Sequence, residues 1–224
     1  MKNDTLNLIT SAVKKEWPSP PAKRQLAPCE DKCVGVIRRE SGGLYKFDSV
    51  TAFDYRPIPT QRTIRRLLLI LESPHRKEYC HPNGPVPANG TTGSNIRRYL
   101  GELLKSKRTL TDPNLEVILV NAVPYQCSQG ATLNDYGKRS KRDKVFRAAF
   151  CAESETHGLE FVRRMSGYVR ASDIVVNCCT KGVTSPALRD LVHDSLMRLG
   201  EKKLIHLSTS HPVSWFNPSH RKFR

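Results

Sequence analysis

Polar side chains that could do chemistry follow each of four short apolar runs in the chain. Glu72 and His75 come after the first run, Asn121 after the second, Thr180 after the third and His211 after the fourth. If the runs are parallel strands of one open sheet, their ends meet at the edge where α/β proteins bind ligands. A carboxylate, an amide and two imidazoles gathered there could serve as acid, base and hydrogen-bonding groups. Each of them alone is more typical of ordinary turn chemistry.

The elements that must position these residues are strands alternating with helices. The predicted strands are the apolar runs at 67–71, 117–120, 174–176 and 204–207. The predicted helices lie at 96–104, at 143–165 with an interruption near 156–158, and from Ser185-Pro186 to Gly200. Because strands and helices alternate, we expect an α/β fold with three layers, α/β/α, around a central, mainly parallel four-stranded sheet.

Length and composition limit the possible domain organisation and partners. We expect two parts, a Pro-rich N-terminal extension over 1–60 and a catalytic domain over 61–224. The net charge of +16 and the pI of 9.8 indicate a polyanionic partner, either nucleic acid or an anionic membrane surface. No apolar run is long enough for a membrane span and no signal peptide is recognisable, so we expect a soluble, cytoplasmic monomer with no membrane partner.

Three motifs and their order resemble the uracil-DNA glycosylase superfamily. Glu72-Ser73-Pro74 follows the first predicted strand, Asn121 the second, and His211-Pro212-Val213-Ser214 the last. The stretch Pro87-Ala88-Asn89-Gly90 falls where the iron–sulfur branches carry Pro-Phe-Val-Gly before a helix. The resemblance covers about residues 65 to 220.

The resemblance implies an enzyme that flips a base out of DNA and hydrolyses its N-glycosidic bond. Glu72 would then stabilise the sugar cation and position water, His211 would stabilise the departing base, and Asn121 would read the pyrimidine edge. Ser73, Pro74, His75, Ala88 and Tyr125 would surround the base. On other interpretations Glu72 pairs with an arginine such as Arg97, and Asn121 only braces its loop.

The departures from the family favour a larger substrate than uracil. Ala88 stands where the family has an aromatic residue that stacks on the flipped base, and Ser73 replaces the aspartate of the fastest uracil-removing branch. We therefore predict excision of a bulky modified pyrimidine, such as glucosylated hydroxymethylcytosine in phage DNA, as an antiviral defence. The polar loop at 83–94 could bind the sugar. Alternatively, Tyr79 or Tyr125 supplies the stacking and the substrate is ordinary uracil.

Basic and aromatic residues near these motifs are candidate DNA contacts. The predicted contacts are Lys138, Arg139, Lys141, Arg142, Ser210, Pro212, Ser214 and Trp215. The run at 138–144 would hold phosphates, and Trp215-Phe216 would enter the duplex unless these rings pack in the core.

The seven cysteines are odd in number and scattered along the chain, so free thiols or metal ligands are expected rather than a disulfide framework. By their order, Cys29, Cys33, Cys127 and Cys151 resemble the ligands of the family's four-iron cluster, although their spacing differs. Zinc or unligated buried thiols are the alternatives. The proposed chemistry itself needs no cofactor.

Two rival functions remain. A non-catalytic DNA-binding module on the same fold would bind DNA whether or not Glu72 is intact. A different nucleotide hydrolase has less support, because the chain contains neither a GxxxxGK[ST] loop nor a GxSxG elbow.

Overall fold

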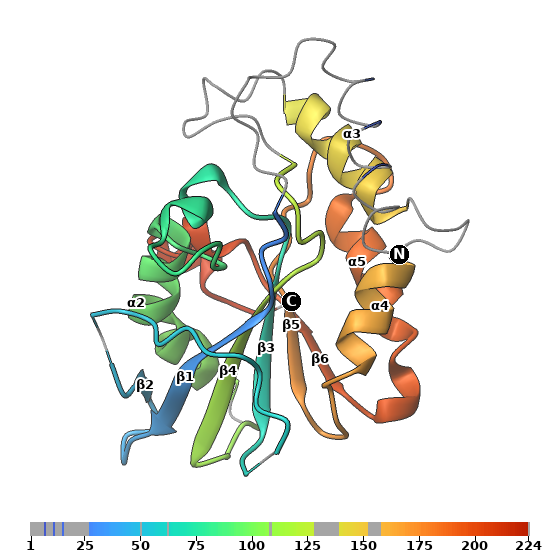
Figure 1. The fold of residues 1–224 in the computed structure, drawn as a ribbon. Helices are drawn as coiled ribbons and strands as arrows, with labels where there is room; N and C mark the ends of the chain where they lie inside the picture. The colour runs from blue at the N-terminus through green and yellow to red at the C-terminus, as the bar shows by residue number, and fades with distance from the viewer. Residues whose placement is uncertain are drawn as a thin grey trace.

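A computed structural model describes residues 27–49, 51–61, 63–107, 109–127, 139–151 and 158–223, together with residues 7, 11 and 15. Its centre is a six-stranded mixed sheet in the order β2-β1-β4-β3-β5-β6 (Figure 1). The strands are β1 (Lys32–Arg39), β2 (Tyr45–Phe47), β3 (Arg66–Leu71), β4 (Asn114–Asn121), β5 (Ile174–Asn177) and β6 (Ile205–Ser208).

The α/β class predicted from the sequence is confirmed, and four of the strands correspond to the four apolar runs. β4, β3, β5 and β6 pair in parallel, with Leu69 opposite Leu119 and Val176 in register. All six residues of β3 are buried, as expected for a strand covered on both faces. The carboxyl ends of these four strands therefore lie at one edge of the sheet.

Two further strands make the sheet larger than the four strands expected. β1 and β2 come from the segment for which the sequence predicted an extension, and both pairings that β1 makes, with β2 and with β4, are antiparallel. Gly101 allows β2 to approach helix α2 (Thr91–Lys105), because a Cβ there would collide with the Tyr45 backbone oxygen. The sequence signal was weak because β2 is short and β1 lacks a clean apolar alternation.

Helices cover both faces of the sheet (Figure 1). On one face α2 packs over Leu67 and Leu69, and on the other side Leu68 and Ile70 face the remaining α-helices. Those helices are α3 (Arg139–Phe150), α4 (Leu159–Ser166) and α5 (Leu188–Met197). The short 3-10 helices are η1 (Arg76–Cys80), η3 (Gly200–Lys202), η4 (Pro212–Ser214) and η5 (Pro218–His220). No helix in the described ranges is both long and apolar enough to cross a membrane.

The predicted start of the last α-helix needs a correction. Pro186 does not open α5, because the helix begins at Leu188 and its N-cap is Ala187. The stretch expected at 143–165, with an interruption, contains the two helices α3 and α4, and residues 152–157 lie outside the described residues.

Candidate functional site

A cavity of about 650 Å³ opens at the carboxyl ends of the parallel strands. Glu72 enters it directly after β3, Thr180 three residues after β5, and His211 three residues after β6. The start of α2 forms a further wall, with Gly90, Thr91 and Thr92. The other lining residues are Leu71, Ser73, His75, Lys77, Glu78, Ala88, Asn89, Arg142, Lys181, Gly182, Val183 and Val213. Three of the four predicted strand ends thus meet in one cavity.

Glu72 is held between a guanidinium and a hydroxyl. Its side chain is 7% exposed, Arg142 Nε lies 3.3 Å from Oε1, and the Thr180 hydroxyl donates a hydrogen bond to Oε2. Burial raises the pKa of Glu72, while Arg142 and Thr180 act in the opposite direction. The alternative that Glu72 pairs with an arginine thus applies to Arg142 and not to the example Arg97, whose guanidinium lies 4.8 Å from the centre of the Phe53 ring.

His211 carries its proton on Nε2. Its Nδ1 accepts a hydrogen bond from the Val213 backbone N–H at 3.2 Å, which leaves Nε2 as the donor. Burial lowers the pKa of His211, the positive charges of Arg142 and Arg189 act in the same direction, and together these effects bring it to about 4. The imidazole is therefore a neutral hydrogen-bond donor at physiological pH.

The residues predicted to surround a base divide into two groups. Ser73, His75 and Ala88 line the cavity, and Ala88 has a backbone φ of 58°. Pro74 and Tyr125 are buried and are not among the lining residues. Within the described residues no Phe, Tyr or Trp lines the cavity, so neither Tyr125 nor Tyr79 takes the stacking position there.

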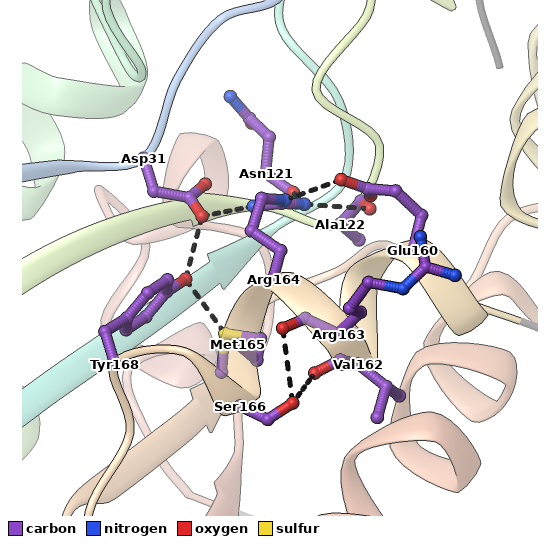
Figure 2. Close-up of polar contacts among 10 residues, drawn as sticks. All are labelled: Asp31, Asn121, Ala122, Glu160, Val162, Arg163, Arg164, Met165, Ser166 and Tyr168. Carbon is purple, nitrogen blue, oxygen red and sulfur yellow. Dashed lines mark hydrogen bonds and ion pairs between the residues drawn. The ribbon is translucent and has the colours of Figure 1, made fainter. Parts of the chain in front are cut away.

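Asn121 lies beside the cavity wall rather than in it. The side chain is 1% exposed, is absent from the lining residues, and has no hydrogen-bond partner at either amide atom. Its backbone oxygen accepts a hydrogen bond of 2.7 Å from Arg164 of α4, and its side chain extends away from that arginine (Figure 2). Arg164 also forms an ion pair with Asp31, whose carboxylate accepts a 2.7 Å hydrogen bond from Tyr168.

Of the predicted DNA contacts in the basic run, only Arg142 has a described side chain. Lys138 lies outside the described residues, and Arg139 and Lys141 belong to α3 with no description of their side chains. Arg142 turns into the cavity, where it contacts Glu72 and, at 2.6 Å, Asp143.

The predicted contacts after β6 mostly hold the loop together. Ser210 and Ser214 donate hydrogen bonds to the backbone oxygens of His220 and His211, at 2.7 and 2.8 Å. Pro212 is buried, and Trp215 is 0% exposed, with its indole N–H donating to the Ser210 oxygen at 2.9 Å. Pro212 and Trp215 are therefore inaccessible to DNA in this arrangement, and the exposed aromatic is Phe216, at 67%.

Three of the four cysteines predicted as cluster ligands contact other polar groups. Cys29 contacts the Glu78 carboxyl at 4.0 Å, Cys33 accepts from Arg56 at 3.9 Å, and Cys127 donates to the Tyr125 oxygen at 3.5 Å. Cys151 is half-buried at the end of α3. In the part of the chain that the structure describes, no three His, Cys, Asp or Glu side chains are grouped to hold a metal.

Three residues in or beside the site were given no role from the sequence. Thr180 stood in a recognised strand-end cluster but carried no assigned role. Glu78 follows Glu72 by six residues, and its burial against the cavity could not be recognised from a charged stretch. Arg164 lies in α4, far along the chain from the Asn121 backbone that it contacts.

The site is thus defined by its own geometry: a paired carboxylate, a neutral imidazole and a roomy cavity between them. Comparison of the chain with protein-family models, with curated proteins and with solved structures gives no match.

Proposed function

We propose that the protein is a DNA glycosylase, which hydrolyses the N-glycosidic bond of a flipped-out pyrimidine and leaves an abasic site. The observation that carries the proposal is that Glu72 and His211 line the same cavity, although they come from different strand ends. A carboxylate and a neutral donor in one site suit a reaction that builds positive charge on a sugar and negative charge on a leaving base.

Glu72 acts on the sugar side of the bond. Its carboxylate stabilises the oxocarbenium-like cation and accepts a proton from the attacking water. Arg142 and Thr180 contact the two carboxylate oxygens and favour the ionised form against the effect of burial.

His211 acts on the base side of the bond. With Nδ1 engaged by the Val213 N–H, the ring presents Nε2–H to a carbonyl oxygen of the base. A neutral donor suits this task because it stabilises the oxygen as charge develops there, without the cost of burying an imidazolium.

The dimensions of the cavity favour a bulky base. A volume of about 650 Å³ lies in the range of about 300–1,000 Å³ that holds drug-sized ligands, and one pyrimidine ring would leave much of it empty. Ala88 contributes only a methyl group, and Asn89, Thr91 and Thr92 supply polar groups along the same wall. The proposed substrate is therefore a pyrimidine with a large polar substituent, such as glucosylated hydroxymethylcytosine in phage DNA. The proposed biological role is antiviral defence in the cytoplasm.

The positive charge of the protein would favour the approach of DNA to the cavity. The net charge of +16 favours phosphate binding, and Phe216 and Val213, exposed by 67% and 47%, can press into the duplex as the base leaves. The parallel order β4-β3-β5-β6, with helices on both faces, supports a uracil-DNA glycosylase-like arrangement of the catalytic part.

Mass spectrometry of released bases tests the proposal. Three DNAs containing uracil, unmodified cytosine or glucosylated hydroxymethylcytosine are incubated with the wild type, with Glu72→Gln and with Glu40→Gln, an exposed control. We expect release of the glucosylated base by the wild type and the control, and its loss in Glu72→Gln.

Other outcomes distinguish the alternatives. Release of uracil instead would favour a repair enzyme. Binding of all three DNAs without release of any base would contradict the proposal and favour a non-catalytic DNA-binding module.

A further inference from the structure

A second carboxyl group, that of Glu78, faces the cavity. Glu78 lies in η1, is 7% exposed and lines the cavity together with Glu72 and His211. Cys29 Sγ lies 4.0 Å from its Oε2, and none of the ion pairs among the described residues includes Glu78. Glu78 is therefore a buried carboxyl at the cavity wall, and no counter-charge is paired with it in the part of the chain that the structure describes.

Glu78 lies close to Asn121 and, unlike Asn121, lines the cavity. The nearby Asn121 amide acts to lower the pKa of Glu78. Both amide atoms of Asn121 are buried. The carboxyl of Glu78 thus reaches the cavity, whereas the amide that the sequence predicted to read the base does not line it.

The surroundings of Glu78 favour its protonated form. Burial raises its pKa to about 8, against the smaller opposing effects of the His75 and Ala88 backbone and the Asn121 amide. The titratable groups packed nearest are Cys29, Tyr55 and Tyr79, and burial raises the pKa of each, so all three are neutral at pH 7. The other titratable groups that line the cavity are Glu72, His75, Lys77, Arg142, Lys181 and His211.

A protonated carboxyl presents a donor and an acceptor side by side. The pairing edge of a 4-aminopyrimidine presents their complement, the N3 lone pair and the N4 amino group. Uracil can also pair with a carboxyl, but its N3 already carries a hydrogen and gains nothing from a proton donor. Only a base of the cytosine type has a free N3 lone pair to which an acidic proton at this position could be transferred.

We propose that Glu78 is a second catalytic residue, a general acid that protonates N3 of a cytosine-type base while its other oxygen accepts a hydrogen bond from the 4-amino group. This inference rests on the proposed glycosylase function and narrows its substrate to 4-aminopyrimidines.

Protonation of the base accompanies cleavage of the glycosidic bond. The Glu78 O–H bond breaks and an N3–H bond forms; the C1′–N1 bond breaks and its electron pair goes to N1. The base departs as a neutral molecule rather than as an anion. Water adds to C1′ and its proton passes to Glu72. Glu72 then releases that proton to solvent, and Glu78 takes up a proton from solvent.

Rates of base release by Glu78→Gln test the inference. Glutamine keeps a donor and an acceptor of the same size but has no acidic proton. With DNA containing glucosylated hydroxymethylcytosine, we expect Glu78→Gln to be at least about 100-fold slower than the wild type, and Glu40→Gln to be unchanged. DNA affinity, measured by fluorescence anisotropy, should stay the same in both variants.

A pH profile of the wild type tests the inference independently of any variant. The rate should fall about tenfold per pH unit above about 8, where Glu78 loses its proton. A flat profile from pH 7 to 10, or release by Glu78→Gln at the wild-type rate, would overturn the role of Glu78.

The same samples separate the two proposals. If the wild type releases the base and Glu72→Gln does not, the glycosylase function holds whatever Glu78→Gln does. If the wild type releases no base from any of the DNAs, both proposals fail together.

Discussion

Arg164 donates a hydrogen bond of 2.7 Å to the backbone oxygen of Asn121, joining α4 to the last residue of β4 (Figure 2). The same guanidinium forms an ion pair with Asp31, next to the start of β1, and contacts Glu160 at 3.1 Å. The edge of the sheet that carries the cavity is thereby anchored to a helix on one face. The charge of Arg164 stabilises the fold around the site and does not line the cavity.

We therefore expect Arg164→Met to destabilise the protein. Removing one partner of a buried ion pair leaves the Asp31 carboxylate uncompensated and costs about 3–5 kcal/mol. Urea unfolding followed by circular dichroism measures this loss, and the double variant Arg164→Met/Asp31→Asn should recover part of it. Equal stability of Arg164→Met and the wild type would show that the pair contributes nothing.

Arg142 should control the charge of Glu72. Replacing it with Gln removes a positive charge 3.3 Å from the carboxylate, so the pKa of Glu72 rises and the ionised, reactive form is less favoured. We expect about 10–100-fold slower base release, from the loss of a charge-assisted contact of about 1.5–3 kcal/mol. The acidic limb of the pH–rate profile should move to higher pH, whereas exposed Arg98→Gln should leave it in place.

His211 should remain neutral throughout the working range. With a folded pKa of about 4 and an ordinary value of 6.5, it takes up a proton in the unfolded chain before it does so in the fold. It therefore contributes stability above pH 6.5 that is lost as the pH falls toward 4. NMR titration of the imidazole measures its pKa directly, and a value above 6 would contradict this account. His211→Ala should slow base release about 100-fold through loss of the donor.

A larger side chain at position 88 should exclude a bulky base from the cavity. Ala88→Phe places a ring in the cavity, so release of glucosylated hydroxymethylcytosine should fall well below the wild-type rate. Ala88→Gly is the matched control, since glycine keeps the wall open and suits the φ of 58°. Release by Ala88→Phe at the wild-type rate would show that the open wall does not set the substrate.

Phe216 should assist base flipping from duplex DNA. Its ring is 67% exposed beside the loop that carries His211, whereas Trp215 is entirely buried. We expect Phe216→Ala to slow release from duplex DNA by about tenfold or more, in line with an unstacking cost of a few kcal/mol, and to spare single strands. Met197→Ala, an exposed residue of α5, serves as the control, and equal effects on both DNA forms would contradict insertion.

Local sequence determined the parallel part of the sheet and the edge that carries the site. Runs such as Leu67–Leu71 bury both faces of a strand wherever they are placed, and a parallel arrangement brings their carboxyl ends together. That reasoning placed Glu72 and His211 in one site. It did not find β2, which has only three residues and depends on contact with α2 and β1.

Only the tertiary structure decided which side chains face the cavity and in which protonation state. In the sequence Arg142 belongs to a basic run, but in the structure it contacts Glu72. Glu78 lies in a charged stretch that is typical of a surface, but in the structure it is buried. Trp215 and Phe216 are adjacent and similar in character, but one is in the core and the other in solvent. Burial and pairing arise from contacts between residues distant in the chain, and those contacts set the pKa values on which the proposed chemistry depends.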